Sequence, residues 1–466
     1  LTKMYTDYRA DRPTIAMAQQ DWTLPEPTKE YYTDSLMDEA KEYSDTAVVV
    51  IGRSGGEGAD LPTDMKSVID GSYAKKAEEV SVSPDNYGYV KGSYTNNGDY
   101  DDFDEGESYL ELSNTEEDML DTVCSQFDNV IVVVNANNAM ELDWVDKYEQ
   151  IGAVIFAPGA GATGFEALGE IINGSVNPSG KTVDTFVKNL TETPYYNNMG
   201  LNAYTNVEDL KEQIAANDPA YEGSMGFVNY AEGIYVGYKF YETAAEEGLI
   251  KYPFGYGLSY TTFDKQIENF KDNGDTVTFD VTVENTGSVA GKDVVEIYYT
   301  APYTNGGIEK AAANLIAFEK TDSIEPGESQ TKSFTINKED MASYDSEGIK
   351  ISGGGYILEA GEYTISLRSD SHTVLGEEKF TVDEDIDYSK DGRSSDKTVA
   401  TNQFEDYARG DFEQLSREDG FANYDKACGV PEEDAYVMSD ETRAAVEENV
   451  FGIYDGTKYN NDSDEM

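Results

Sequence analysis

Three continuous apolar runs constrain the fold of this chain more than any other feature of its sequence. They are Ala-Val-Val-Val-Ile at 47–51, Val-Ile-Val-Val-Val at 130–134 and Ala-Val-Ile-Phe-Ala at 153–157. Apolar residues at helical spacing precede the first run at 35–43, and a capping box of Ser113 and Glu116 opens a helix before the second. Continuous apolar strands alternating with helices predict a mainly parallel sheet covered by helices, an α/β sandwich over residues 1–263.

The hydrophobic period changes to two beyond this region. Alternating runs occupy 276–284, 294–299, 332–336 and 363–367, with glycine-containing turns between them. Short alternating strands with such turns predict an antiparallel, all-β sandwich over residues 264–383. The remaining residues, 384–466, are acidic and poor in aliphatic clusters, with one short helix expected near 441–449. We expect this last region to be a connector and tail.

The charge balance excludes several classes of partner. The chain has 92 acidic and 34 basic residues, a formal net charge of −58. Such a field repels nucleic acid and anionic lipid, whereas a neutral sugar is indifferent to it. No run approaches the roughly 20 apolar residues of a membrane span. The chain opens at Leu1 without a signal-like segment, so we expect a fragment, and its location stays open between cytoplasm and exterior.

The sequence also limits the available chemistry. Cys124 and Cys428 are far apart and lack a metal-ligand pattern, which argues against a disulfide framework or a zinc site. The single histidine, His372, lies in a polar Ser-Asp-Ser-His-Thr stretch that is typical of a turn. Catalysis by a Ser-His or Cys-His arrangement would depend on this one residue.

A glycine-rich stretch at 159–164, Gly-Ala-Gly-Ala-Thr-Gly, matches the dinucleotide-binding pattern, with Asp184 at the separation of a ribose-binding acid. The pattern falls late in the domain, however, and Pro158 interrupts the strand before it. We therefore favour a structural turn and expect no cofactor.

Two further stretches have a functional and a structural interpretation. The acidic loop 99–107 has Gly106 in the position of an EF-hand loop, but Phe103 and Leu112 occupy ligand positions. We favour a surface loop and predict no metal site, while a cation site of another type stays open. Within Val-Met-Ser-Asp at 437–440, Ser439 or Asp440 would cap the following helix.

Glu57 lies between glycines directly after the first apolar run, in Gly-Arg-Ser-Gly-Gly-Glu-Gly-Ala-Asp at 52–60. This stretch resembles a segment of glycoside hydrolase family 3, the β-glucosidase and β-xylosidase group. Further stretches resemble the family in the same order: Asn-Pro-Ser-Gly-Lys at 177–181 with Thr185-Phe186, 230–239, 253–263, and Glu-Asn-Thr-Gly at 284–287, which opens a fibronectin-III-like domain.

The resemblance implies a retaining glycosidase that uses two carboxylates and hydrolyses terminal β-linked sugars. It implies that Glu57 is the acid/base residue, and it makes Arg53 and Asp60 candidates for substrate binding. The nucleophilic aspartate of the family lies on a (β/α)-barrel domain, which this sequence lacks. Retention requires the two carboxyl groups to be about 5–5.5 Å apart.

Some family members carry the barrel last, and Phe404, Asp411 and 415–420 resemble their connector into it. Without the barrel, in cis or in trans, we expect the chain to be inactive. The Val-Met-Ser-Asp stretch resembles the nucleophile motif but lacks the Trp that commonly follows, and we interpret it as a decoy. The alternative is a non-catalytic carbohydrate-binding or scaffolding module with the same fold.

Overall fold

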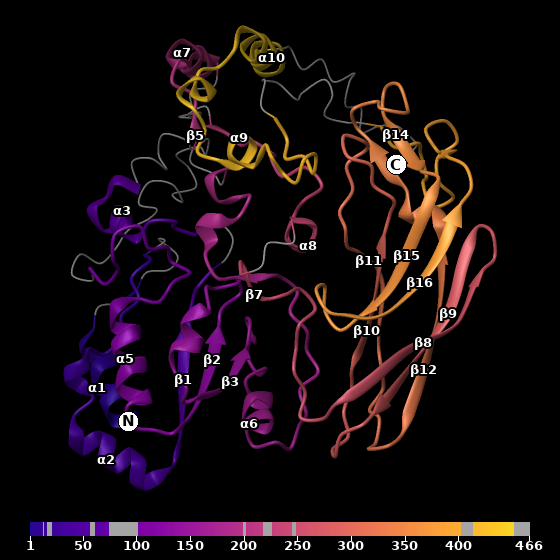
Figure 1. Ribbon diagram of the computed structural model, residues 1–466. Helices are drawn as coiled ribbons and strands as arrows, with labels where there is room; N and C mark the ends of the chain where they lie inside the picture. Colours follow the sequence, from indigo (N-terminus) through magenta and orange to yellow (C-terminus); the bar gives the residue numbers. More distant parts are fainter. Residues whose placement is uncertain are drawn as a thin grey trace, which may run out of the picture.

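The computed structural model describes residues 1–12, 14–15, 21–55, 61–73, 101–198, 202–217, 226–244, 248–401 and 413–451. It has an α/β half and an all-β half side by side, with the C-terminal helices α9 and α10 lying over one end of the α/β half (Figure 1).

The α/β half is built on a three-stranded parallel sheet of order β1-β2-β3. Its strands are β1 (Thr46–Gly52), β2 (Asn129–Asn135) and β3 (Ile151–Phe156), as the three apolar runs predict. The helices of this half are α1 (Thr2–Asp11), α2 (Asp34–Tyr43), α3 (Met65–Asp70), α5 (Asn114–Cys124), α6 (Glu166–Ile172), α7 (Glu208–Asn217) and α8 (Tyr238–Ala244). Two small strand pairs complete it: β4 (Phe186–Val187) with β7 (Ile250–Tyr252), and β5 (Asn202–Ala203) with β6 (Gly226–Phe227).

One face of the sheet forms the core of this half. Val49 and Ile51 of β1 pack with Met37 of α2 and with Leu120 of α5 in one buried cluster. Thr33 caps α2 by accepting the Leu36 N–H, and Ser113 and Glu116 form the predicted capping box of α5. The opposite face of the sheet is covered less completely: Val48 and Val50 of β1 are 47% and 55% exposed.

The all-β half is a sandwich of antiparallel sheets. One sheet has the order β11-β10-β15-β16 and another has the order β12-β9-β8. Their strands are β8 (Phe263–Asp272), β9 (Thr276–Asn285), β10 (Val294–Thr300), β11 (Asn314–Lys320), β12 (Ser329–Asn337), β15 (Gly361–Arg368) and β16 (Val374–Val382). A smaller sheet joins β13 (Ser343–Asp345), β14 (Gly355–Leu358) and β17 (Ile386–Asp387). Alternating residues of β9, from Val277 to Val283, are fully buried between the sheets.

Polar contacts join the two halves. Asn177 accepts hydrogen bonds from the Ser259 hydroxyl and the Tyr260 N–H, and donates to Ala290 O. The Lys181 ammonium of the α/β half lies 3.6 Å from Asp293 of the all-β half. We call this contact region the joint, and it contains three of the stretches that resemble the family: 177–181, 253–263 and 284–287.

The predicted connector and tail are in part docked onto the α/β half. Residues 413–451 include α9 (Tyr424–Cys428) and α10 (Asp440–Phe451), and Leu415 N–H donates to Ala231 O at 2.7 Å. Asn206 exchanges two hydrogen bonds with the backbone of Met438. Phe404 and Asp411 lie outside the described residues. This docking involves the 230–239 stretch, so that stretch serves to hold the C-terminal segment.

A glycine in the joint can be tested by substitution. Gly255 has φ +82°, and a Cβ added there would lie 2.3 Å from the Glu296 Oε2. Gly274, in the β8–β9 turn, has φ +93° and no atom within 4 Å of its Cβ position. Both alanine variants carry the backbone strain, but only Gly255→Ala collides with a carboxylate. Gly255→Ala should therefore lose about 1–3 kcal/mol more in urea unfolding. Equal losses would contradict the proposed contact.

The buried Glu296 predicts a pH dependence of stability. Burial raises its pKa to about 7, and its carboxylate accepts the Tyr298 hydroxyl at 2.8 Å. Since the folded state holds this proton more tightly than the unfolded chain, the stabilisation is complete below about pH 4.5. It is lost as the pH rises towards 7 and beyond, by roughly 3 kcal/mol at most. Glu296→Gln should flatten this part of the stability profile, and an unchanged slope would contradict the assignment.

Candidate active site

The carboxyl ends of the three parallel strands meet at one edge of the sheet. β1 and β2 run in register from Thr46 opposite Asn129 to Gly52 opposite Asn135. The Arg53 N–H donates to Asn135 O at 3.0 Å, which continues the ladder by one residue. Ligands of open α/β sheets bind at this edge, so the segments that follow the strands form the candidate site.

The segments at this edge are packed tightly against one another. The Gly159 N–H donates to Asn137 Oδ1 at 2.6 Å, and a Cβ at Gly55 would lie 2.7 Å from Asn138 Oδ1. The glycine-rich turn at 159–164 therefore packs against the segment after β2 and leads into the seven-residue α6. A larger residue at 55 would require the exposed Asn138 amide to shift.

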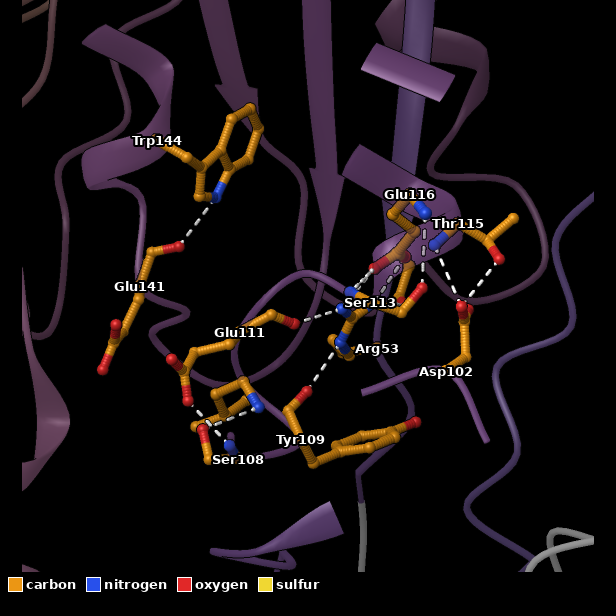
Figure 2. A network of polar contacts seen from close by, with 12 residues as sticks. Arg53, Asp102, Ser108, Tyr109, Glu111, Ser113, Thr115, Glu116, Glu141 and Trp144 are labelled. Atoms are coloured by element: carbon orange, nitrogen blue, oxygen red, sulfur yellow. Dashed lines mark hydrogen bonds and ion pairs between the residues drawn. The ribbon is translucent and has the colours of Figure 1, made fainter. Parts of the chain in front are cut away.

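Arg53 is the residue around which this edge is organised (Figure 2). Its side chain is 1% exposed, and Nε donates to Tyr109 O at 2.7 Å. Nη1 donates to Gly52 O, Nη2 to Glu111 O, and the two nitrogens bind the two carboxylate oxygens of Glu116 at 2.7 and 2.6 Å. All five guanidinium N–H groups therefore have acceptors within the protein.

The Glu116 carboxylate takes part in two interactions, the capping box of α5 and the ion pair with Arg53. Its carboxylate accepts the Ser113 N–H at 2.9 Å, which completes the capping box of α5, and it also pairs with Arg53. A bidentate pair with additional hydrogen bonds is the arrangement that best offsets the desolvation of two buried charges. The cap of α5 thereby fixes the direction in which the chain leaves β1.

The surroundings of this pair favour protonated carboxyl groups. Burial raises the pKa of Glu26 to about 7, and the nearby Glu116 carboxylate adds to the shift. Burial likewise raises the pKa of Glu141 to about 7, although its carboxylate accepts the Leu190 N–H at 2.6 Å. A general acid near neutral pH needs this kind of environment.

The structure describes one of the three predicted site residues. Glu57 and Asp60 lie outside the described residues, and the side chain of Arg53 is buried. The resemblance makes Arg53 a candidate for substrate binding, and a sugar hydroxyl that bound its guanidinium would have to displace one of the five protein acceptors. In this arrangement Arg53 holds the chain around it.

The other stretches singled out in the sequence have structural roles. In the acidic loop, Asp102 accepts the Thr115 N–H and hydroxyl, Asp101 pairs with Lys66, and Phe103 is buried. Met438 is buried, and the Ser439 hydroxyl accepts the Thr442 N–H at the start of α10. Both the loop and the cap agree with the structural interpretation.

The histidine and the cysteines also lie away from the sheet edge. His372 is in the turn between β15 and β16, with Nδ1 3.1 Å from Glu242 Oε2, and the two cysteines are buried without forming a disulfide. Within the described ranges, no group of three or more His, Cys, Asp or Glu side chains could hold a metal ion. Nor is any helix in those ranges long and apolar enough to cross a membrane.

Comparison with known proteins identifies the two halves. Residues 31–238 match the model of the glycosyl hydrolase family 3 C-terminal domain, and residues 293–371 match that of the fibronectin type III-like domain. The chain carries a glycosyl hydrolase family 3 C-terminal domain. The sheet edge, Arg53 and its partners all lie within this family 3 domain, as does the segment with Glu57.

The relatives of the family 3 chain include several β-glucosidases. It is 33% identical over 382 residues to β-glucosidase A of Butyrivibrio fibrisolvens, covering 78% of this chain and 40% of the relative. It is 30% identical to a β-glucosidase of Ruminococcus albus, covering 82% of this chain and 33% of that protein. The chain therefore spans well under half of the length of either relative.

Solved structures of β-glucosidases are similar in fold to this chain. β-Glucosidase 3B of Thermotoga neapolitana in complex with glucose matches 83% of this chain and 44% of its own, with a TM-score of 0.61 at 26% identity. A β-glucosidase of Paenibacillus barengoltzii matches 79% of this chain and 33% of its own, with a TM-score of 0.60 at 28% identity.

Sequence reasoning missed the partners of Arg53. The capping box identified Glu116 as a helix cap, but a cap is normally exposed, and nothing local indicated a buried arginine beside it. Tyr109 gave no signal at all, because one tyrosine among 35 is not distinctive. A glutamate cap next to the buried face of its helix, together with an arginine at a strand end, is the signal that could have suggested the pair.

The Arg53–Glu116 pair predicts an asymmetric effect of two neighbouring substitutions. Glu116→Ala leaves the buried guanidinium unpaired and should lower the free energy of unfolding by about 3–5 kcal/mol. Glu117→Ala, in the same turn of α5, removes only an exposed pair with Lys147 at 3.7 Å and should cost less than about 1 kcal/mol. Chemical denaturation measures both, and similar losses would contradict the structural importance of the buried pair.

Proposed function

We propose that this chain is the acid/base half of a retaining β-glucosidase-type glycosidase, with Glu57 as the acid/base residue. The observation that carries the proposal is the position of Glu57. It follows the carboxyl end of β1 within the matched family 3 domain, and the relatives of that domain are β-glucosidases. The substrate would be a terminal β-linked sugar of an oligosaccharide or glycoside.

In this proposal the Glu57 carboxyl group acts twice. It donates its proton to the glycosidic oxygen as the bond to the anomeric carbon breaks and an aspartate of the barrel forms a glycosyl ester. It then takes a proton from the water that attacks the anomeric carbon and releases the aspartate.

The aspartate would come from a (β/α)-barrel, in cis or in trans, that closes over this edge. The docked segment 413–451 supports a barrel placed after this chain, because it returns the polypeptide to the α/β half near α7. Asp60 is proposed to contact the sugar. Without the barrel the chain would not hydrolyse glycosides.

The test uses the barrel-containing enzyme, or this chain mixed with a separately expressed barrel, and an aryl β-glucoside. Glu57→Ala should lower kcat about 10²–10⁴-fold, the usual contribution of a general acid/base. Azide should restore turnover and yield β-glucosyl azide, because azide attacks the glycosyl ester without a general base. Glu105→Ala, an exposed acid nearby, is the control and should retain activity.

Undiminished activity of a folded Glu57→Ala enzyme would refute the acid/base assignment. Absence of activity in every barrel combination, together with measurable binding of a β-glucoside, would favour the alternative of a non-catalytic carbohydrate-binding module.

A further inference from the structure

Residues 107–111 contact the chain on both sides of the segment that carries Glu57. On the entry side, Tyr109 O accepts Arg53 Nε and the Tyr109 hydroxyl accepts the Ser54 N–H at 3.2 Å. On the exit side, the Tyr109 N–H donates to Pro62 O at 3.0 Å, and Glu107 O accepts the Met65 N–H at 2.8 Å. We call residues 107–111 the bracket.

Tyr109 is the residue of the bracket that reaches both sides. It uses its N–H, its carbonyl and its hydroxyl for these contacts, and it is 1% exposed. Its ring packs edge-on against Trp22 with centroids 5.0 Å apart, and the Arg53 guanidinium lies 5.6 Å from the ring centroid. The interior of the domain therefore fixes Tyr109, and Tyr109 in turn fixes Ser54 and Pro62.

We propose that Tyr109 is a positioning residue for catalysis: it holds both ends of the 56–60 segment and thereby sets where the Glu57 carboxyl group lies. This inference rests on the proposed acid/base role of Glu57. Fixing both ends of a short segment reduces the conformations open to it, so releasing one end displaces the side chains it carries. A displacement of about 1 Å can cost about 10²-fold in rate.

Tyr109→Phe is the variant that isolates this role. It keeps the ring, both backbone contacts and the packing against Trp22, and it removes only the contacts of the hydroxyl with the N–H and the side chain of Ser54. Tyr363→Phe is the matched control, because Tyr363 is also 1% exposed and its hydroxyl donates to Glu359 O at 3.1 Å in the fibronectin-like domain.

Amide hydrogen exchange tests the structural part on the chain alone, without any activity. Tyr109→Phe should make the Ser54 amide exchange about fivefold faster, the factor that corresponds to one ordinary hydrogen bond. The Tyr363→Phe control should leave Ser54 unchanged. If Tyr109→Phe leaves the exchange of Ser54 unchanged, the bracket does not hold the entry side and the inference is overturned.

Kinetics of the barrel-containing enzyme test the catalytic part. Tyr109→Phe should lower kcat about tenfold on an alkyl β-glucoside, whose leaving group needs a proton, with KM changed less than twofold. The loss in kcat/KM, which reports the step that forms the glycosyl ester, should be much smaller on a dinitrophenyl β-glucoside, because dinitrophenolate leaves without protonation. A purely structural defect would lower both rates by the same factor, and that result would overturn the inference.

Different results would refute the acid/base role of Glu57 and the positioning role of Tyr109. If Glu57→Gln keeps its activity on the alkyl glucoside, the acid/base assignment itself is wrong. If Glu57→Gln is inactive on that substrate while Tyr109→Phe behaves like the Tyr363→Phe control, only the positioning role of Tyr109 is wrong.

Discussion

The buried ion pair between Arg53 and Glu116 fixes the edge of the sheet on which the proposed chemistry depends. Two charges removed from water are costly unless each finds partners, and here the guanidinium has five acceptors. Those acceptors come from the end of β1, from residues 109 and 111, and from the first turn of α5. One side chain therefore joins the end of β1 to residues 109–116, about 60 residues later in the sequence.

The stretches that resemble the family are used mainly for assembly. The Asn285 side chain accepts the Thr261 hydroxyl and donates to two carbonyls, so the Asn-Thr-Gly turn holds the fibronectin-like domain against the 253–263 stretch. Glu309 of the same domain binds the Tyr235 hydroxyl and the Arg417 N–H. The fibronectin-like domain thereby contacts both the α/β half and the docked C-terminal segment.

Much of this fold could be predicted from the sequence, because local patterns determine it. The apolar runs give the three parallel strands, period two gives the sandwich, and Ser113 with Glu116 gives the start of α5. Tertiary contacts decide the rest. The docking of residues 413–451 was not foreseen, since an acidic segment with few aliphatic residues carries no pattern that shows its Phe421 packing against Tyr235.

The candidate site could be predicted only in part, for the same reason. Its place at the strand ends follows from topology. Topology does not show that the Arg53 guanidinium is bound by protein acceptors, because an arginine at the end of a strand is suited equally well to a ligand contact or to a buried ion pair. Only the positions of Glu116 and Tyr109, about 60 residues away in the sequence, distinguish the two roles.

Affinity labelling tests most directly whether this edge carries the acid/base group of a β-glucosidase. A bromoacetyl β-glucosylamine places its amide nitrogen where the glycosidic oxygen of a substrate lies and its reactive CH2Br carbon two bonds beyond it, so an acid/base carboxylate beside that oxygen displaces bromide and forms an ester. In the barrel-containing enzyme, peptide mapping should find the label on Glu57, and glucose should protect against it. Labelling at another carboxylate, with Glu57 unmodified and glucose still protective, would contradict the account.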